Sequence, residues 1–131
     1  MVGIVLVSHS HLQAVGLQEM AAQMSRGLVN IAAAGGVDEQ TMGTNAERIY
    51  QAIQNVYTYD GVLILFDLGS ALLSTQLAID MFPSDQQVHI KLSDAPMVEG
   101  AIAAAVEASL GHNLGEVNAA AEATKDMQKI L

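Results

Sequence analysis

Short apolar runs alternate with amphipathic stretches from one end of the chain to the other. Residues 2–7, 28–34 and 62–66 are almost entirely apolar, which is typical of strands buried on both faces of a sheet. Residues 88–92 alternate apolar and polar positions and predict a strand at or near a sheet edge. Helical spacing predicts helices between these runs, beginning with 12–26 and ending with an Ala- and Glu-rich helix over 114–130.

The helix boundaries and inner faces follow from local sequence. The expected boundary residues are Gly27 at the end of the first helix, Thr44 with Glu47 as a capping box at the start of the second, Ser70 as the cap and Pro83 beyond the end of the third, and Ser93 or Asp94 as the cap, Pro96 in the first turn and Gly111 at the end of the fourth. The residues at helical spacing, expected to pack inward, are Leu17, Met20, Ala21 and Met24, then Ala46, Ile49, Ile53 and Val56, then Leu73, Leu77 and Met81, and finally Val98, Ala101, Ile102 and Ala105.

Four strand–helix units with an extra C-terminal helix predict an α/β fold in one domain over residues 1–131. We expect a flavodoxin-like, doubly wound, mainly parallel sheet with strand order 2-1-3-4, helices on both faces and room for an extra edge strand. In this order the first and third strands are neighbours at the topological switch point, where open α/β sheets place their ligands. His9 follows the first strand and Asp67 follows the third, so we expect the two side chains to share one crevice.

Composition limits the classes of function. The formal net charge is −9, so the chain lacks the basic surface that nucleic acids or anionic membranes require. Cysteine is absent, which excludes a disulfide framework and a cysteine nucleophile. The apolar runs are too short to span a bilayer, and no secretory signal is evident, so we expect a cytoplasmic protein. The acidic surface favours partners with a basic docking face.

An imidazole beside a carboxylate can act as a nucleophile toward phosphorus. The carboxylate would accept a hydrogen bond from one ring nitrogen of His9 and leave the other nitrogen free to carry a phosphoryl group. Backbone amides at helix N-termini would hold that group. The expected phosphoryl-binding residues, all small and near this sheet edge, are Ser10, Gly36, Gly43, Thr44, Gly69 and Ser70. No Lys or Arg is expected near this edge.

Other interpretations of these residues stay open. His9 could be structural, and Asp67 could simply form a turn before Gly69. His11 could be the nucleophile, a docking residue or neither. His9 and His11 lack further ligands at convincing spacing, so we expect no metal site. His89, placed in a strand, and His112 are expected to be structural or exposed. The glycine-rich segments match no nucleotide-binding fingerprint, so we expect this chain alone to bind no cofactor.

Several segments together resemble the phosphoryl-carrier subunit of bacterial dihydroxyacetone kinase that depends on the phosphoenolpyruvate phosphotransferase system. They are Gly3–Ser10, Ala33–Gly36, Met42–Thr44 and Asp60–Ser74, and the resemblance covers nearly the whole chain. It implies a mannose-type enzyme IIA fold and a homodimer. It also implies that His9 accepts a phosphoryl group from the phosphohistidine of HPr, with Asp67 at the acidic position that pairs with the histidine.

The resemblance further implies that His9 passes the group to ADP on the L subunit, where the nucleotide stays bound as a coenzyme. The ATP formed there phosphorylates dihydroxyacetone held covalently on a histidine of the K subunit. Some relatives continue into HPr-like and enzyme I-like domains, whereas this sequence ends at Leu131, so both are expected to be separate proteins. Two alternatives remain: a mannose-type enzyme IIA that serves a sugar transporter, and a non-catalytic regulatory module of the same fold.

Overall fold

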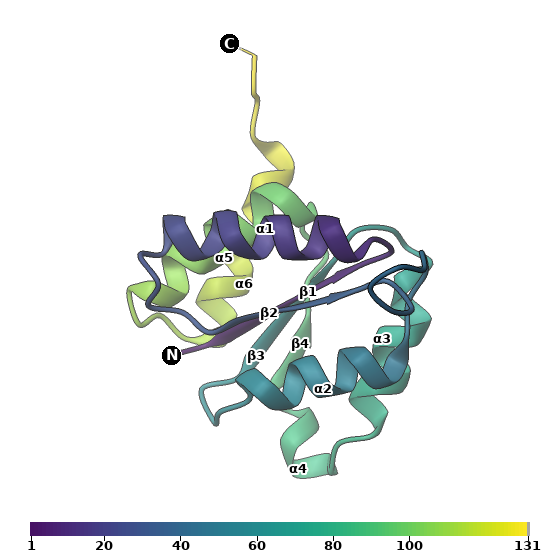
Figure 1. Cartoon of the computed structure of the whole chain (residues 1–131). Coiled ribbons are helices and arrows are strands. Elements are labelled where there is room, and N and C mark those ends of the chain that lie inside the picture. The colour runs from purple at the N-terminus through teal and green to yellow at the C-terminus, as the bar shows by residue number, and fades with distance from the viewer. Residues whose placement is uncertain (131) are drawn as a thin grey trace.

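A parallel four-stranded sheet with helices on both faces forms the body of the molecule (Figure 1). The structure is a computed structural model that describes residues 1–130. The strands are β1 (Gly3–Ser8), β2 (Ile31–Gly35), β3 (Val62–Phe66) and β4 (Ile90–Leu92), and the helices are α1 (His11–Met24), α2 (Ala46–Val56), α3 (Ala71–Asp80), α4 (Ser84–Gln87), α5 (Met97–Ser109) and α6 (Leu114–Ala123), followed by a 3-10 turn over Thr124–Asp126. The strand order β2-β1-β3-β4 confirms the predicted order, and every pairing is parallel.

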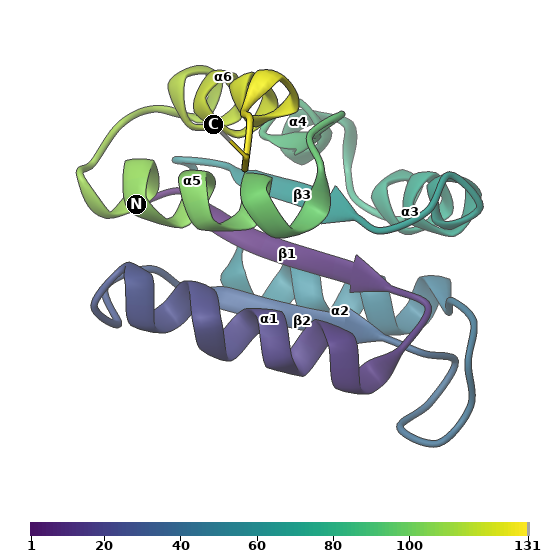
Figure 2. The same ribbon diagram turned by 90° about the horizontal axis from the view of Figure 1, so that it is seen from above.

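The side chains of β1 alternate between two hydrophobic cores. Ile4 and Leu6 belong to the core beneath α1, α5 and α6, whereas Val5 and Val7 belong to the core beneath α2 and α3. Strand β3 divides in the same way, with Leu63 and Leu65 on the first face and Val62 and Ile64 on the second. Figure 1 shows α1, α5 and α6 on one side of the sheet and α2, α3 and α4 on the other, and Figure 2 looks down on the first of these layers, with α1 and α5 in front of the sheet. Because both faces are covered, the central strands are apolar on both faces rather than on one, with Ser8 as the polar exception at the end of β1.

Several predicted boundaries were wrong. Strand β2 begins at Ile31 rather than at residue 28, because Arg26 and Gly27 both adopt positive φ and residues 28–30 form the connection from that turn. Strand β4 begins at Ile90, so His89 lies in the preceding turn, edge-on to Tyr59, and not in a strand. Helix α4 was not predicted. Within residues 1–130 the sheet has four strands and no extra edge strand.

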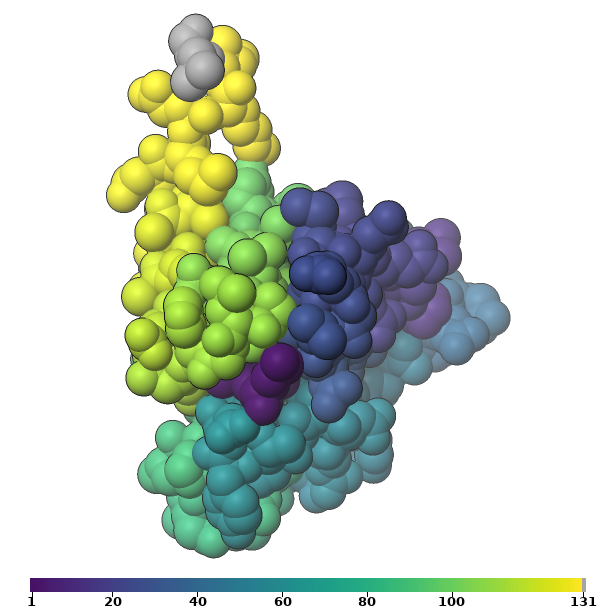
Figure 3. All heavy atoms as spheres, turned by 90° about the vertical axis from the view of Figure 1, so that its left-hand side faces the viewer, coloured from purple at the N-terminus to yellow at the C-terminus, as the bar shows by residue number. Residues whose placement is uncertain are grey.

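The C-terminal half also departs from expectation. Helix α5 has Pro96 at its N-cap instead of in its first turn, and the Ser93 hydroxyl accepts from Ala95 N–H without capping the helix. Helix α6 begins with a capping box formed by Asn113 and Glu116, and the helix ends at Ala123 rather than at residue 130. Residues after the 3-10 turn extend away from the body of the molecule (Figure 3).

Some helix faces are reversed relative to the prediction. The side chains of Leu73, Leu77 and Met81 point outward, because α3 packs inward through the smaller Ala71, Thr75 and Ala78. Met20, Met24 and Val98 are likewise exposed. In α2, by contrast, Ile49, Ile53 and Val56 are buried as predicted, and in α5 Ala101 and Ala105 are fully buried.

Candidate functional site

His9 and Asp67 meet at the carboxyl ends of β1 and β3, as the strand order predicted. The register pairs Val7 with Phe66, and Asp67 N–H donates to the Val7 carbonyl just beyond the last strand residue. His9 Nδ1 lies 2.9 Å from Asp67 Oδ1. A carboxylate only accepts hydrogen bonds, so Nδ1 carries the ring proton and Nε2 keeps a lone pair.

Four hydrogen bonds hold the Asp67 carboxylate in place. Oδ1 accepts from the His9 ring and from Leu68 N–H at 2.7 Å, and Oδ2 accepts from His9 N–H and from Ser8 Oγ, each at 3.0 Å. Partial burial raises the pKa of Asp67, but the bonds from the His9 backbone, the His9 ring, Ser8 and Leu68 outweigh it and leave that pKa below its ordinary value. Asp67 is therefore ionised at neutral pH.

The other ring nitrogen of His9 faces Ser70. Ser70 Oγ lies 2.8 Å from His9 Nε2 and donates to it, because Nε2 is unprotonated. Ser70 occupies the N-cap position of α3 with helical φ and ψ, and its side chain makes no capping bond, so the predicted capping role was wrong. Its hydroxyl is instead bonded to His9 Nε2, the ring nitrogen that keeps a lone pair.

The N-terminus of α3 brings free backbone amides beside His9 Nε2. Ala71 and Leu72 N–H donate to the Leu68 and Gly69 carbonyls, but the N–H groups of Gly69 and Ser70 donate to no other group within residues 1–130. An added Cβ at Gly69 would meet no atom within 4 Å, so this corner is open. Such amides, at the positive end of a helix, are suited to an anion.

The other predicted phosphoryl-binding residues have different partners. Gly36 N–H donates to the Ser8 carbonyl and Gly43 N–H donates to the His9 carbonyl at 2.9 Å, so neither amide is free, although both glycines have positive φ. Ser10 Oγ caps α1 by accepting from Gln13 N–H. Thr44 does not cap α2; Asn45 does, and Thr44 Oγ1 pairs with Ser74 Oγ on α3 at 2.8 Å. Gly36 and Gly43 are thus tied to the backbone around His9, whereas the hydroxyls of Ser10 and Thr44 are engaged by α1 and α3.

His11 differs from His9 in what its Nδ1 atom contacts. Arg48 Nη2 lies 3.4 Å from His11 Nδ1 and 3.0 Å from the Gly35 carbonyl. Arg48 can only donate, so His11 Nδ1 accepts and the proton of the neutral ring sits on Nε2. The outer nitrogen of His11 is thus a donor, whereas that of His9 is an acceptor. Arg48 also corrects the expectation that no Lys or Arg lies near this edge.

Sequence reasoning missed Ser8, Gln13 and Arg48. Ser8 is fully buried at the end of β1, and its hydroxyl contacts both Asp67 and Gln13. A serine at the end of an otherwise apolar strand is the signal that could have identified it. Arg48 lies on α2, remote in sequence from the histidines, and nothing in the local pattern around it indicates its direction.

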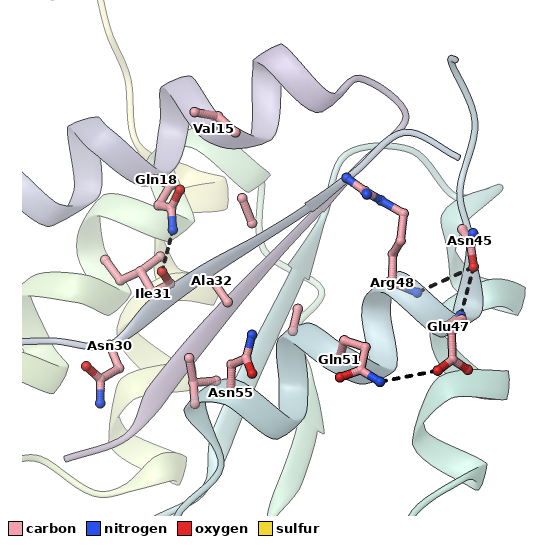
Figure 4. A pocket seen from close by; sticks show the side chains of 13 residues that line it. Val15, Gln18, Asn30, Ile31, Ala32, Asn45, Glu47, Arg48, Gln51 and Asn55 are labelled. Atoms are coloured by element: carbon pink, nitrogen blue, oxygen red, sulfur yellow. Dashed lines mark hydrogen bonds between the residues drawn. The ribbon is translucent and has the colours of Figure 1, made fainter. Parts of the chain in front are cut away.

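The cleft shown in Figure 4 is separate from His9 and Asp67. That cleft, of about 720 Å³, lies between α1, the β2 edge and α2. There Gln18 Nε2 donates to the Ile31 carbonyl, and the Arg48 guanidinium donates to the Gly35 carbonyl. These bonds satisfy two acceptors at the edge of the sheet that no other strand pairs with. Neither His9 nor Asp67 lines this cleft.

Residues 1–130 contain no cluster of three or more His, Cys, Asp or Glu side chains arranged to hold a metal ion. Across the same residues, every helix is too short or too polar to cross a bilayer. His112 pairs with Glu107 at the far end of α5, away from the site.

Comparison with known proteins identifies the family. Residues 3–118 match the EIIA-man family model, described as the PTS system fructose IIA component. The chain is 41% identical, over its full length, to the phosphoryl donor subunit DhaM of PEP-dependent dihydroxyacetone kinase from Providencia stuartii, but covers only 28% of that protein. It is 39% identical to a Listeria innocua subunit DhaM of dihydroxyacetone kinase 2, covering 82% of this chain and 86% of that one.

A solved structure of a protein of unknown function has a TM-score of 0.82 and 37% identity, covering 94% of this chain and 95% of the other. The chain spans about a quarter of the length of the first curated relatives, whereas the Listeria innocua relative is similar in extent. The resemblance read from the sequence motifs is thereby confirmed. The chain belongs to the EIIA-man family of the phosphotransferase system, and within it to the group of DhaM phosphoryl donor subunits.

Proposed function

We propose that this chain carries a phosphoryl group on His9 Nε2 between two other proteins. It would accept the group from the phosphohistidine of HPr and deliver it to ADP bound on the L subunit of dihydroxyacetone kinase, which acts with the K subunit on dihydroxyacetone. One observation carries this proposal: His9 Nδ1 is fixed on the Asp67 carboxylate, so the nitrogen that remains nucleophilic faces the open corner at α3.

The two transfers leave the site unchanged. The Nε2 lone pair attacks phosphorus, the N–P bond of the donor breaks, and its electron pair returns to the donor imidazole. In the second transfer a terminal oxygen of the ADP β-phosphate attacks the same phosphorus, and the Nε2–P bond breaks. Phosphorylated His9 is electron-poor, and the Asp67 carboxylate beside Nδ1–H stabilises it.

Ser70 and the start of α3 are proposed to receive the phosphoryl oxygens. The Ser70 hydroxyl occupies Nε2 in the resting protein and must rotate away before phosphorus can bond to that atom. After rotation it can donate to a phosphoryl oxygen, together with the free N–H groups of Gly69 and Ser70. Amides without a bound cation hold an anion loosely, which suits a group in transit.

The surroundings of His9 favour macromolecular partners over a small substrate. Leu12 and Met42 line a pocket together with Ser10 and His11, and they are 79% and 74% exposed. Leu12 follows His11 in α1, and Met42 precedes Gly43, whose N–H is bonded to the His9 carbonyl. Large exposed apolar side chains of this kind mark protein contact surfaces. ADP and ATP would be held by the L subunit and not by this chain.

The proposal is tested by phosphoryl transfer from purified components. Incubation with phosphoenolpyruvate, enzyme I and HPr should add the mass of one phosphoryl group, in an acid-labile and base-stable linkage. His9→Gln should abolish the adduct, whereas the matched variant His11→Gln should retain it. Native-like labelling of His9→Gln would refute the assignment of the nucleophile.

A second assay separates the kinase from the sugar transporter as the acceptor. Addition of the K and L subunits should restore phosphorylation of dihydroxyacetone, and His9→Gln should not support it. If the chain is phosphorylated but cannot supply the L subunit, and instead supplies a mannose-type transporter, the proposed acceptor is wrong. If no phosphoryl group is accepted at all, the non-catalytic module of the same fold is favoured.

A further inference from the structure

The hydroxyl of Ser8 has one proton and two acceptors for it. Ser8 is fully buried at the end of β1, where its Oγ lies 2.7 Å from Gln13 Oε1 and 3.0 Å from Asp67 Oδ2. A carboxamide oxygen and a carboxylate oxygen only accept hydrogen bonds, so either contact needs the same Ser8 proton. Ser10 N–H donates to Ser8 Oγ at 3.0 Å and occupies one of its lone pairs. Gln13 and Asp67 therefore compete for a single donor.

The start of α1 holds Gln13 beside Ser8. The backbone N–H of Gln13 donates to Ser10 Oγ, the N-cap of the helix, at 3.2 Å. Within residues 1–130 the Gln13 side chain bonds to Ser8 alone, although Gln13 is exposed and lines a small pocket with Asp67 and Leu68. A long, exposed side chain loses rotamer freedom when it is ordered. The 2.7 Å bond to a buried hydroxyl offsets that loss and keeps the carboxamide next to the site.

We infer that Gln13 is a positioning residue for the pair of His9 and Asp67, because it sets the share of the Ser8 proton that Asp67 receives. This inference rests on the proposed function, in which Asp67 stabilises the phosphorylated ring of His9. The other three bonds to the carboxylate come from His9 N–H, the His9 ring and Leu68 N–H, and each of these donors has one acceptor. Only the bond from Ser8 is divided between two acceptors.

The competition affects how strongly Asp67 holds the Nδ1 proton of His9. A carboxylate that receives weaker hydrogen bonds keeps more of its basicity, so it binds the proton of the ring more strongly. When Nε2 bonds to phosphorus, the ring becomes electron-poor and its Nδ1 proton becomes more acidic. A more basic Asp67 then stabilises the phosphorylated ring better. Gln13 thus favours phosphorylated His9 by drawing the Ser8 proton toward itself, and no bond to Gln13 forms or breaks in the transfer.

The ¹H resonance of His9 Nδ1–H tests the competition in the unphosphorylated chain, because it moves downfield as Asp67 holds this proton more strongly. Gln13→Met removes the competing acceptor but keeps a long side chain, so Ser8 donates to Asp67 alone and the resonance should move upfield. Gln13→Glu supplies a charged acceptor, which draws the Ser8 proton from Asp67, so the resonance should move downfield. The matched control Gln23→Met changes an exposed glutamine at the other end of α1 and should leave the resonance in place.

Opposite shifts in the two Gln13 variants distinguish the inferred role from a structural one, since loosened packing around α1 would move the resonance in the same direction in both. Shifts of the same sign would therefore overturn the inference. An unchanged resonance in Gln13→Met would overturn it too, because Ser8 would then already donate fully to Asp67 in the native chain. In a Ser8→Ala background Gln13→Met should have no effect, and a shift that persists there would show that Gln13 does not act through Ser8.

Phosphoryl exchange with HPr measures the consequence for transfer. In Gln13→Met the less basic Asp67 should move the equilibrium between phospho-HPr and phosphorylated His9 toward phospho-HPr by about three- to tenfold, the effect of part of one hydrogen bond. An unchanged equilibrium would show that Gln13 is not a positioning residue for the transfer. If the native chain accepts no phosphoryl group, the proposed function is wrong, and the resonance shifts alone decide whether Gln13 and Asp67 compete for the Ser8 proton.

Discussion

The two carboxylate oxygens of Asp67 together accept four hydrogen bonds. Replacing Asp67 with asparagine exchanges one of these oxygens for an amide nitrogen. Asparagine keeps one oxygen, so two of the four donors lose their acceptor. If the amide takes the place of Oδ1, it donates to His9 Nδ1, and the ring proton moves to Nε2. The nitrogen that we propose as the nucleophile then carries a proton and cannot attack phosphorus.

The expected losses of stability and of transfer rate follow from these hydrogen bonds. Hydrogen bonds to charged groups contribute about 1.5–3 kcal/mol each. The Asp67 side chain is 13% exposed, which allows some rehydration of the orphaned donors. We therefore expect Asp67→Asn to lower the free energy of unfolding by about 2–3 kcal/mol. Reversal of the His9 tautomer raises the activation free energy of the transfer step by a similar amount. This increase corresponds to about 30- to 150-fold slower phosphorylation.

Rapid-quench transfer from phospho-HPr measures the rate, and ¹⁵N NMR of the imidazole reports the tautomer. Asp85→Asn, an exposed residue of α4, is the matched control and should leave both unchanged. A native-like transfer rate in Asp67→Asn together with a protonated His9 Nε2 would refute the reasoning, because the carboxylate would then not select the reactive nitrogen.

Four further outcomes are expected. Ser70→Ala should shorten the lifetime of the phosphohistidine by about tenfold, the effect of one lost hydrogen bond, measured by loss of label. Gly35→Ala should destabilise the fold by about 1–3 kcal/mol in denaturant unfolding, because its Cβ would lie 2.5 Å from the Ser10 carbonyl oxygen. Gly16→Ala, with open space around the new methyl, should stabilise α1 by about 0.5–1 kcal/mol. The stability difference between the native chain and Asp67→Asn should be constant near neutrality and should shrink below about pH 4, because the lowered pKa of Asp67 makes its contribution disappear as the pH falls through that pKa.

The sheet and the contact between His9 and Asp67 could be predicted because the relevant signals are local. Apolar runs mark β1 and β3, and the right-handed connection rule then places the residues that follow them side by side. The face of α3 could not be predicted in this way. Helical periodicity identifies apolar residues, but it does not distinguish those that this chain buries from those that it leaves exposed at the surface. The small residues Ala71 and Thr75 fit against the neighbouring elements, which leaves Leu77 outside.

Capping and cation positions escaped prediction for another reason. Thr44 and Asn45 are adjacent and both favour an N-cap, and the tie is decided by tertiary contact, since Ser74 takes the Thr44 hydroxyl. Arg48 has a long side chain on α2 whose target, the edge of β2 near His11, depends on how α1, β2 and α2 pack. Such choices depend on distances that appear only after the chain has folded.

The register between β1 and β3 links chemistry to folding kinetics. His9 and Asp67 are 58 residues apart in sequence, and they meet only when Val7 pairs with Phe66. A slip by one residue would turn every side chain of the strand to the opposite face and move the carboxylate away from the imidazole. Such long-range pairing is among the slower events of folding. On the proposed function, the time at which His9 first becomes phosphorylatable during refolding would therefore report when β1 and β3 pair.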